Sequence, residues 1–398
     1  MKILVVSQHY APEPFRLPDL CEALMAAGHT VKVVTDVPNY PEGYIYPEYK
    51  GGKRRDEIIN GVPVHRTFTV GRRKNVIFRF LNYYSWRFSA GHYLKNLKED
   101  YDVVFSWQTS PVMMSQPALD YAKKNGKKVL LYCLDIWPAC LKAGGIGSGP
   151  VFEYFKSLSR KIYSGADKIL VSSEMFIDYF KNTHGIEGER IAHLPQYAES
   201  VFEGLYDATN GDEINLTFAG NVGKAQSVET IIKAAALVND PRVKWNIIGD
   251  GSSLDECKRI ASEKGLSNVI FHGRHPLSEM PAFYAKADAM LLTLCDDEII
   301  SYTLPGKVQT YMAASKPVIA AAGGESKLVI QKSGCGFCTP PDDAEALAES
   351  VNRFVAMSCE ERREMGKRAS EYYKKHFAKE IFVSAIISEL EALAKHDL

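Results

Sequence analysis

Short apolar runs alternate with amphipathic segments along almost the whole chain. Runs of about four to eight aliphatic residues, ended by glycine or polar residues, are typical of buried strands. In the first half they predict strands at Ile3–Ser7, Thr30–Thr35, Val62–Thr69, Val103–Trp107, Lys128–Leu134, Lys168–Val171 and Ile191–Leu194. In the second half they predict strands at Asn215–Ala219, Lys244–Ile248, Val269–His272, Ala289–Leu294, Val318–Ala322 and Gly336–Thr339. Helical patterns lie between several of them, for example Leu17–Ala27, which ends at Gly28.

This alternation predicts an α/β protein with two doubly wound, Rossmann-like parallel sheets. The 398 residues suffice for two domains, each with its own core. We predict an N-terminal domain at residues 1–195, a polar linker at 196–213, a C-terminal domain at 214–376, and a last helix at 377–398 that packs back on the N-terminal domain. Because ligands of such sheets lie beyond the carboxyl ends of the strands, we expect the site in the cleft between the domains.

Composition narrows the class of protein. With 46% hydrophobic and 24% charged residues, the chain is typical of a globular enzyme, and no apolar run is long enough to span a bilayer. The opening MKILVVSQHY has the pattern of a strand and lacks the cleavage site of a signal peptide. The eight cysteines have no disulfide-framework spacing. These features predict a cytoplasmic protein.

One segment of the basic first half combines positive charge with aromatic residues. Gly71–Lys98 interleaves arginines and lysines with phenylalanine, tyrosine and tryptophan. Such a stretch can lie in the interface of an anionic membrane, or it can be a core helix whose arginines face water. The aromatic residues nearly encircle the predicted helix, which favours the region Arg72–Lys98 as a contact with the inner leaflet. Nucleic acid is disfavoured because no nucleic-acid-binding motif accompanies the charge.

Two lysine-bearing loops are the strongest candidates for chemistry. In Leu304–Ala320 a Pro-Gly turn opens a short helix that carries Lys307, and in Phe218–Ala235 a strand ends in a glycine-rich loop that carries Lys224. Helix N-termini present unpaired N–H groups and a positive dipole end, so a lysine there adds to an anion site. Each loop taken alone is equally consistent with ordinary strand-to-helix turn chemistry. Together the two loops predict a site that binds one diphosphate between them, as in a nucleotide-sugar site.

Other loops refine this interpretation. Gly249 and Gly251 follow one predicted strand and Phe271–Arg274 ends the next, where backbone groups can border a nucleotide base. The first strand, by contrast, leads into SQHYAPEPFRLPDL, which lacks a GxGxxG motif. An NAD-dependent enzyme is therefore disfavoured.

A series of motifs in a fixed order gives the chain a family resemblance. They are KILVVSQHYAPE, PNYPEGYIYPEYKG, LDIWPACL, GADKILVSS, FAGNVGKAQ, WNIIGDGSS, FHGRHP, PGKVQTYMAASKPVIA and SGCGFCTPPDDAEALAESV. With them the chain resembles the GT-B-fold glycosyltransferases of family 4 over essentially its whole length. The resemblance is strongest to the branch that builds bacterial O-antigen and capsule polysaccharides, which includes N-acetyl-fucosamine transferases.

The resemblance implies retaining transfer of a sugar from a nucleotide diphosphate sugar, a UDP-sugar in our prediction, to a polyprenyl-diphosphate-linked acceptor, without a metal or other cofactor. The N-terminal domain would bind the acceptor and the C-terminal domain the donor. The implied catalytic residues are Asp135, Lys224 and Lys307. The implied donor contacts are Gly220, Asn221, Gly223, Gln226, Gly249, Gly251, Arg274, His275, Glu298, Thr303, Leu304, Pro305 and Gln309, and the implied acceptor contacts are Arg16 and Trp137.

The chain also departs from the family pattern. Many members carry two glutamates around the Lys307 helix, where this chain has Tyr302 and Thr310. We expect Gln309 or Glu298 to take the ribose contact instead. Arg16 either meets an acceptor phosphate or lies in water, two interpretations the sequence leaves open. A histidine after the first strand, His9, is interpreted as a packed strand-end residue rather than a base, because no carboxylate partner is visible in the sequence.

Two alternatives to a transferase remain open at this stage. One is a sugar-nucleotide 2-epimerase, which shares the GT-B architecture and needs no acceptor. The other is a catalytically silent GT-B partner protein, an interpretation motivated by the absent glutamates. The two retained lysine loops favour an active enzyme.

Overall fold

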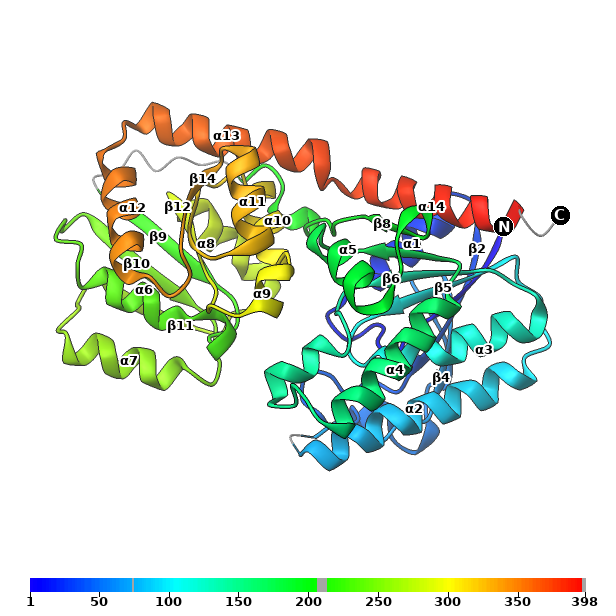
Figure 1. The fold of residues 1–398 in the computed structure, drawn as a ribbon. Coiled ribbons are helices and arrows are strands. Elements are labelled where there is room, and N and C mark those ends of the chain that lie inside the picture. The colour runs from blue at the N-terminus through cyan, green and yellow to red at the C-terminus, as the bar shows by residue number, and fades with distance from the viewer. Residues whose placement is uncertain (74, 206–212, 396–398) are drawn as a thin grey trace. The chain divides into compact units, whose positions relative to one another are not determined.

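Every predicted strand pairs in parallel with at least one neighbour, and the pairing produces two separate sheets (Figure 1). The structure is a computed structural model that describes residues 1–73, 75–205 and 213–395. It divides into an N-terminal unit, Met1–Leu194 with Val383–Leu398, and a C-terminal unit, Pro195–Phe382. The prediction of an α/β protein with two parallel sheets is confirmed.

The N-terminal unit contains an eight-stranded sheet. Its strands, in spatial order, are β3 (Asp56–Ile59), β4 (Val62–Thr67), β2 (Thr30–Asp36), β1 (Lys2–Val6), β5 (Val103–Gln108), β6 (Val129–Cys133), β7 (Lys168–Val171) and β8 (Ile191–His193). The central strands are buried on both faces, which explains why they appear in the sequence as continuous apolar runs. The order reverses direction beside β1, so the loop after β1 lies at a topological switch point.

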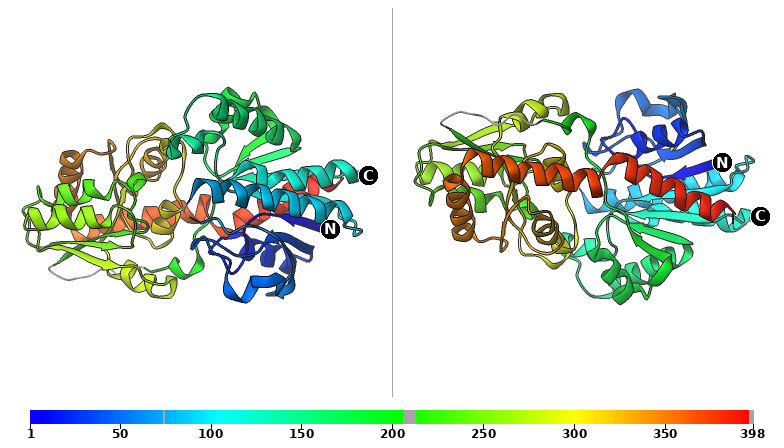
Figure 2. Two further views of the ribbon diagram at one scale, coloured as in Figure 1. Left: turned by 90° about the horizontal axis from the view of Figure 1, so that it is seen from below. Right: turned by 90° about the horizontal axis from the view of Figure 1, so that it is seen from above.

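Helices cover this sheet. They are α1 (Leu17–Ala26), α2 (Val76–Asn96), α3 (Gln116–Asn125), α4 (Pro150–Gly165) and α5 (Met175–Tyr179), and most of α14 (Lys379–Lys395) belongs to the same unit. Helices α2 and α3 lie side by side (Figure 2). The Asn75 side chain caps α2 by accepting a hydrogen bond from the Ile77 N–H at 2.8 Å.

One strand was not predicted. Strand β3 pairs antiparallel with β4 at the edge of the sheet, through a turn in which Asn60 and Gly61 have φ of 49° and 86°. Asn-Gly with two positive φ angles is a favoured two-residue hairpin turn, so the signal was present in the sequence. The strand itself, Asp-Glu-Ile-Ile, is too short and too polar to stand out.

The C-terminal unit contains a six-stranded parallel sheet with Rossmann-like strand order. Its strands, in spatial order, are β11 (Val269–Gly273), β10 (Val243–Ile248), β9 (Ile214–Ala219), β12 (Ala289–Thr293), β13 (Val318–Ala321) and β14 (Gly336–Thr339). Its helices are α6 (Val228–Ala235), α7 (Leu254–Glu263), α8 (Met280–Lys286), α9 (Glu298–Tyr302), α10 (Gly306–Ala313), α11 (Gly324–Ser333), α12 (Ala344–Ala356) and α13 (Cys359–His376).

Two apolar cores cover the two faces of this second sheet. Alternate residues of β9 enter different cores, Phe218 on the face covered by α6, α7 and α12 and Ala219 on the face covered by α8, α10 and α13. Apolar packing therefore covers both faces of the sheet from which the loops at its carboxyl edge extend.

Candidate functional site

Adjoining loops at the carboxyl edge of the C-terminal sheet form one hydrogen-bonded layer. The Gly220 N–H donates to the Ile248 carbonyl at 2.9 Å, and the Val222 N–H donates to the Asp250 carbonyl at 2.9 Å. The Gly249 N–H in turn donates to the Gly273 carbonyl at 2.7 Å. The ends of β9, β10 and β11 are thus joined backbone to backbone.

Glycine is required in this layer because the loops approach too closely for side chains. A Cβ atom on Gly249, where φ is 137°, would lie 1.8 Å from the Gly220 carbonyl oxygen. A Cβ on Gly251 would lie 2.4 Å from the Val222 carbonyl oxygen. A Cβ on Gly223 would lie 2.6 Å from the Asn221 amide nitrogen. The contacts at Gly249 and Gly251 are with backbone and cannot be relieved without moving the loops, whereas the contact at Gly223 is with the Asn221 side chain.

Lys307 reaches this layer from the first turn of α10. Its ammonium lies 3.9 Å from the centre of the Phe218 ring, and a Cβ on Gly220 would lie only 2.7 Å from its Nζ atom. The Nζ atom is buried and forms no hydrogen bond within the described chain. Burial lowers the pKa of Lys307 to about 7. A desolvated amine without a partner, held over a glycine, is positioned to receive an anion.

The other predicted lysine, Lys224, is exposed on a loop that two neighbouring segments hold in place. The Thr293 hydroxyl donates to the Gln226 carbonyl at 2.6 Å, and the Cys295 N–H donates to the Ala225 carbonyl at 3.1 Å. The Asn221 amide donates to the Gln226 side-chain oxygen at 3.1 Å, which closes the loop on itself. Lys224, Asn221 and Gln226 therefore belong to one ordered segment.

Sequence reasoning missed Asp342, which ties this loop to its neighbours. The Asp342 carboxylate accepts hydrogen bonds from the Ser227 hydroxyl and, at 2.9 Å, from the Asp296 N–H. Asp342 itself has a φ of 58°, within the left-handed region that aspartate tolerates. The Pro-Pro-Asp-Asp run marks a turn in the sequence, but nothing in it indicates this long-range contact.

Two residues predicted to border the base lie at the end of β11. Arg274 is exposed. The His275 ring pairs with Glu279, Nδ1 to Oε2 at 2.7 Å, and its Nε2 lies 3.2 Å from the His272 carbonyl oxygen. His275 is therefore engaged with its own loop.

The segment from Glu298 to Pro305 leads into α10. Glu298 is exposed in the first turn of α9, and the Thr303 hydroxyl donates to the Ile299 carbonyl at 3.2 Å. Leu304 is buried, and Pro305 is the N-cap residue of α10 with φ of −70° and no capping side chain. The N-terminus of α10 therefore has neither a capping side chain nor an acidic residue in its first turn to compensate the positive end of its dipole.

Gln309 and Thr310 do not have the accessibility that a ribose contact needs. Gln309 is 1% exposed, and in the amide orientation that satisfies its hydrogen bonds its nitrogen donates to the Pro305 carbonyl at 2.9 Å. The Thr310 hydroxyl donates to the Gly306 carbonyl at 3.0 Å. The expectation that Gln309 replaces a family glutamate at the ribose stays a prediction, and the burial and hydrogen bonds of Gln309 count against it.

In the N-terminal unit, Asp135 follows strand β6. Its backbone carbonyl accepts a hydrogen bond from the Gln108 side chain at 2.9 Å. Burial raises the pKa of the Asp135 carboxyl, while hydrogen bonds from Ser110 and the charge of Arg72 oppose that shift. Asp135 is thus a half-buried carboxyl at the carboxyl edge of this sheet.

The predicted acceptor residues have different surroundings. Trp137 is 3% exposed, its indole N–H donates to the Ser110 hydroxyl at 3.0 Å, and its ring packs on Phe155. Trp137 is therefore held by packing within its own unit, and its assignment as an acceptor contact stays a prediction. Arg16 is half-buried at the start of α1 and does not lie in water. Burial raises the pKa of the Tyr132 hydroxyl, and the positive charge of Arg16 acts in the opposite direction by lowering it.

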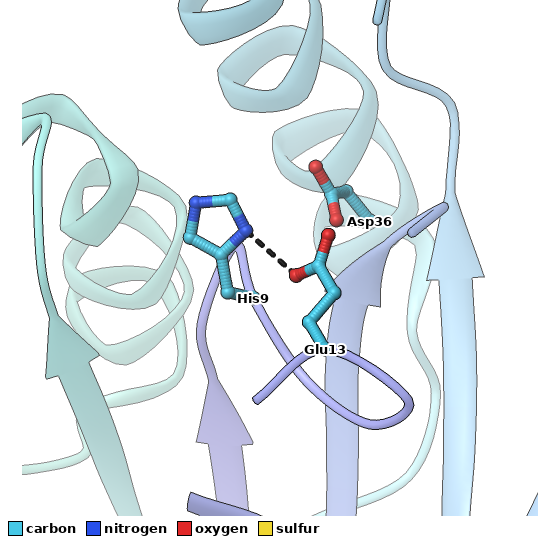
Figure 3. A group of neighbouring side chains, drawn as sticks. All are labelled: His9, Glu13 and Asp36. Carbon is cyan, nitrogen blue, oxygen red and sulfur yellow. Dashed lines mark hydrogen bonds and ion pairs between the residues drawn. The ribbon is translucent and has the colours of Figure 1, made fainter. Parts of the chain in front are cut away.

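His9 has a carboxylate partner, contrary to the prediction. Figure 3 shows His9 and Glu13, both from the loop after β1, and Asp36 at the end of β2, pointing toward one another. The His9 Nδ1 atom lies 2.8 Å from Glu13 Oε2, and Glu13 Oε1 accepts the Asn39 and Tyr40 N–H groups at 2.7 Å each. The other half of the prediction is confirmed, since His9 is 4% exposed and stacks on Phe15.

These three side chains are the one group of the described residues whose ligand atoms converge, within 4.8 Å, as metal ligands would. Hydrogen bonds link them in two steps, because His9 pairs with Glu13, and Asn39 donates from its backbone N–H to Glu13 and from its side-chain amide to Asp36 Oδ2 at 3.1 Å. Burial and the neighbouring Glu13 carboxylate raise the pKa of Asp36 well above its usual range. We therefore interpret the group as a hydrogen-bonded histidine–carboxyl network that fixes the loop after β1.

A search of the described helices finds none with the length and apolar character that a bilayer span requires. The cysteines are all unpaired thiols.

Comparison with known proteins extends these observations. The family description "Glycosyltransferase Family 4" matches residues 17–196, and "Glycosyl transferases group 1" matches residues 207–372. The glycosyltransferase WbjE of Pseudomonas aeruginosa is 29% identical over 273 residues, which cover 64% of this chain and 66%, just under two thirds, of that protein. The colanic acid biosynthesis glycosyl transferase WcaI of Escherichia coli is 22% identical and covers 90% of this chain and 93% of its own.

A solved structure shows the same fold. Alr3699/HepE of Anabaena, crystallised with UDP-glucose, superimposes with a TM-score of 0.71 and 15% identity, over 99% of this chain and 100% of its own. Family matches to both units and two Rossmann-like sheets together lead to one conclusion: the chain is a glycosyltransferase of family 4 with the GT-B fold.

Proposed function

We propose that the protein transfers a sugar, with retention of configuration, from a UDP-sugar to a polyprenyl-diphosphate-linked oligosaccharide during synthesis of a bacterial surface polysaccharide. The proposed donor sugar is N-acetylated, in line with the resemblance to N-acetyl-fucosamine transferases. The relative WcaI is named for colanic acid biosynthesis, which supports a role in polysaccharide synthesis. HepE was crystallised with UDP-glucose, which supports a UDP-sugar as the donor.

The buried, unpartnered ammonium of Lys307 is the observation that carries the proposal. A leaving diphosphate beside Gly220 would give this ammonium the counter-ion that it lacks, and the dipole of α10 would add to the attraction. Lys224, on the ordered loop beside it, would supply a second charge. The protein could then stabilise the departing phosphate with its own groups.

The remaining assignments follow the division into units. In the proposal the C-terminal unit binds the donor and the N-terminal unit the acceptor, with Asp135 and Arg16 as candidate acceptor contacts. Helix α2 supports a membrane location, since it buries Tyr83 and Trp86 but leaves Ile77 and Phe88 exposed. The buried face of α2 fits the interpretation as a core helix, and its exposed apolar face supports the proposed membrane contact.

Ligand-dependent thermal unfolding tests the donor assignment. The wild-type protein is heated with UDP, GDP, ADP or dTDP and with their sugars, beside Lys307→Met and a matched control, Lys264→Met on an exposed turn of the same unit. At a hundredfold excess over Kd, a ligand stabilises by about 2.7 kcal/mol, or roughly 2–4 °C. We expect this shift with the uridine ligands in the wild type and the control only.

Three outcomes decide between the candidates. A shift that survives Lys307→Met would exclude the proposed diphosphate site. Conversion of a UDP-sugar without any acceptor, followed by product analysis, would identify an epimerase. Selective binding combined with transfer to a lipid-linked acceptor would establish the transferase.

A further inference from the structure

A cavity of about 730 Å³ opens on the N-terminal unit between α2 and strand β4. Part of its wall is a stacked pair of rings, His65 and Tyr93, whose centroids are 3.7 Å apart. The His65 ring is fixed by Asp56, Nδ1 to Oδ1 at 2.6 Å. Phe68 and Phe88, both exposed, complete the apolar part of the wall. The cavity is therefore a preformed feature with an ordered floor.

The charged residues that line this cavity are all of one sign. They are Arg55, Arg66 and Lys98, beside the imidazole rings of His65 and His92, and none of the described residues that line the cavity is acidic. Arg66 is already paired with Glu57, Nε to Oε1 at 2.6 Å. The exposed side chains of Arg55, His92 and Lys98, in contrast, form no hydrogen bond or ion pair with any residue that the structure describes. They remain available to an anion.

An apolar stripe leads into the cavity along α2. Ile77, Leu81, Tyr84 and Phe88 follow one another at intervals of three or four residues, so they share one face of the helix. Ile77 is 66% and Phe88 67% exposed, and Phe88 belongs to both the stripe and the cavity wall. This face lies opposite the one that buries Trp86 and Ala90. An apolar surface that ends in a cationic cavity matches an anionic amphiphile.

We propose that this cavity binds the phosphate head group of an anionic phospholipid whose acyl chains lie along the apolar stripe. The inference rests on the membrane location in the proposed function and adds a defined lipid site to it. The two cations without a partner, Arg55 and Lys98, would select an anionic over a zwitterionic head group. The cavity is within the usual size range of small-ligand sites, roughly 300–1,000 Å³.

Calorimetric titration with short-chain lipids below their micelle concentration tests the proposal. The probes are dihexanoyl phosphatidylglycerol, dihexanoyl phosphatidylcholine and glycerol phosphate, which separate the charge of the head group from the contribution of the chains. The variant Arg55→Glu with Lys98→Glu removes the cavity charge, and Phe88→Ser shortens the stripe. Lys123→Glu, an exposed charge reversal on α3, is the matched control.

We expect saturable binding of phosphatidylglycerol, at least about tenfold weaker binding of the other two probes, and a loss of about tenfold or more in the double variant. Lys123→Glu should bind like the wild type. Equal binding of both lipids, or equal losses in the double variant and the control, would overturn the proposal. UDP-sugar binding by the same variants separates the two hypotheses, because a defect in the lipid site leaves it unchanged and a failed donor assignment shows as no UDP-sugar binding in any variant.

Discussion

The affinity for the donor should depend on pH because Lys307 must gain a proton when it binds a diphosphate. In the free protein, burial lowers the pKa of Lys307 to about 7, so the amine is mostly neutral at pH 8. A bound diphosphate favours the ammonium and should return the pKa to at least its ordinary value, about 10.4. Each binding event above pH 7 therefore takes up a proton, and affinity falls as the pH rises.

The size of the effect follows from that pKa. The fraction of protonated Lys307 falls about tenfold between pH 6 and pH 8, so Kd should rise about tenfold, equivalent to about 1.4 kcal/mol. The ligand must be a UDP-sugar rather than UDP, because the diphosphate of the sugar ester has no proton to lose in this interval. Calorimetry in two buffers of different ionisation enthalpy should measure uptake of nearly one proton at pH 8.

Two variants serve as controls for this dependence. Lys307→Arg keeps its charge at all these pH values and should bind with little pH dependence, although the longer side chain fits the site less well. Lys307→Met should bind weakly at every pH and should raise the melting temperature of the free protein, because it removes a buried amine without a partner. A wild-type Kd that stays constant between pH 6 and pH 8, or a slope that survives in Lys307→Met, would refute the reasoning.

Three further substitutions test the supporting structure. Gly249→Ala should destabilise the C-terminal unit by about 3 kcal/mol or more, since its Cβ meets a backbone oxygen at 1.8 Å, whereas Gly265→Ala, with open space around it, should cost about 1 kcal/mol in urea unfolding. Asp342→Ala should weaken UDP-sugar binding several-fold and lower stability by about 1 kcal/mol, because the Lys224 loop loses its anchor; an unchanged Kd would exclude this role. Asp36→Asn should stabilise the protein increasingly, relative to the wild type, as the pH rises above the ordinary aspartate pKa of about 3.9, because the raised pKa of Asp36 opposes its ionisation in the folded wild type while the unfolded chain ionises it freely; urea unfolding at several pH values measures this difference, and a difference that does not change with pH would exclude it.

The sequence predicted the sheets well because their strands are buried on both faces. A strand such as β1 must be apolar at nearly every position, and this leaves a continuous run that no other element of similar length imitates. The edge strand β3 has one partner strand and alternating exposure, so its pattern is weak. Only the Asn60-Gly61 turn could have revealed it.

Side-chain direction was the part of the site that sequence could not supply. The motifs place Trp137 after β6 and Gln309 in α10, but whether a side chain faces a ligand or the core depends on the residues that pack around it. Ser110 and Phe155 hold Trp137, and the carbonyl of Pro305 holds Gln309. A motif specifies a position along an element and not the partner that captures the side chain there.

The same limit explains why the glycine loops were easier to predict than their polar neighbours. A side chain at Gly220 would occupy the space that another chain segment fills, so a glycine at this position is consistent with a segment packed closely against the backbone. The group that packs against Gly220 is the Lys307 side chain. The glycine loop after β9 and the lysine at the N-terminus of α10, which were predicted separately, are therefore in contact. Thr310, at the position of a family glutamate, and its neighbour Gln309 form hydrogen bonds within the first turns of α10. In our proposal the backbone amides and the two lysines therefore bind the charged diphosphate. A donor site of this kind should tolerate changes at Thr310 and Gln309 that preserve the helix, and should not tolerate a side chain at Gly220.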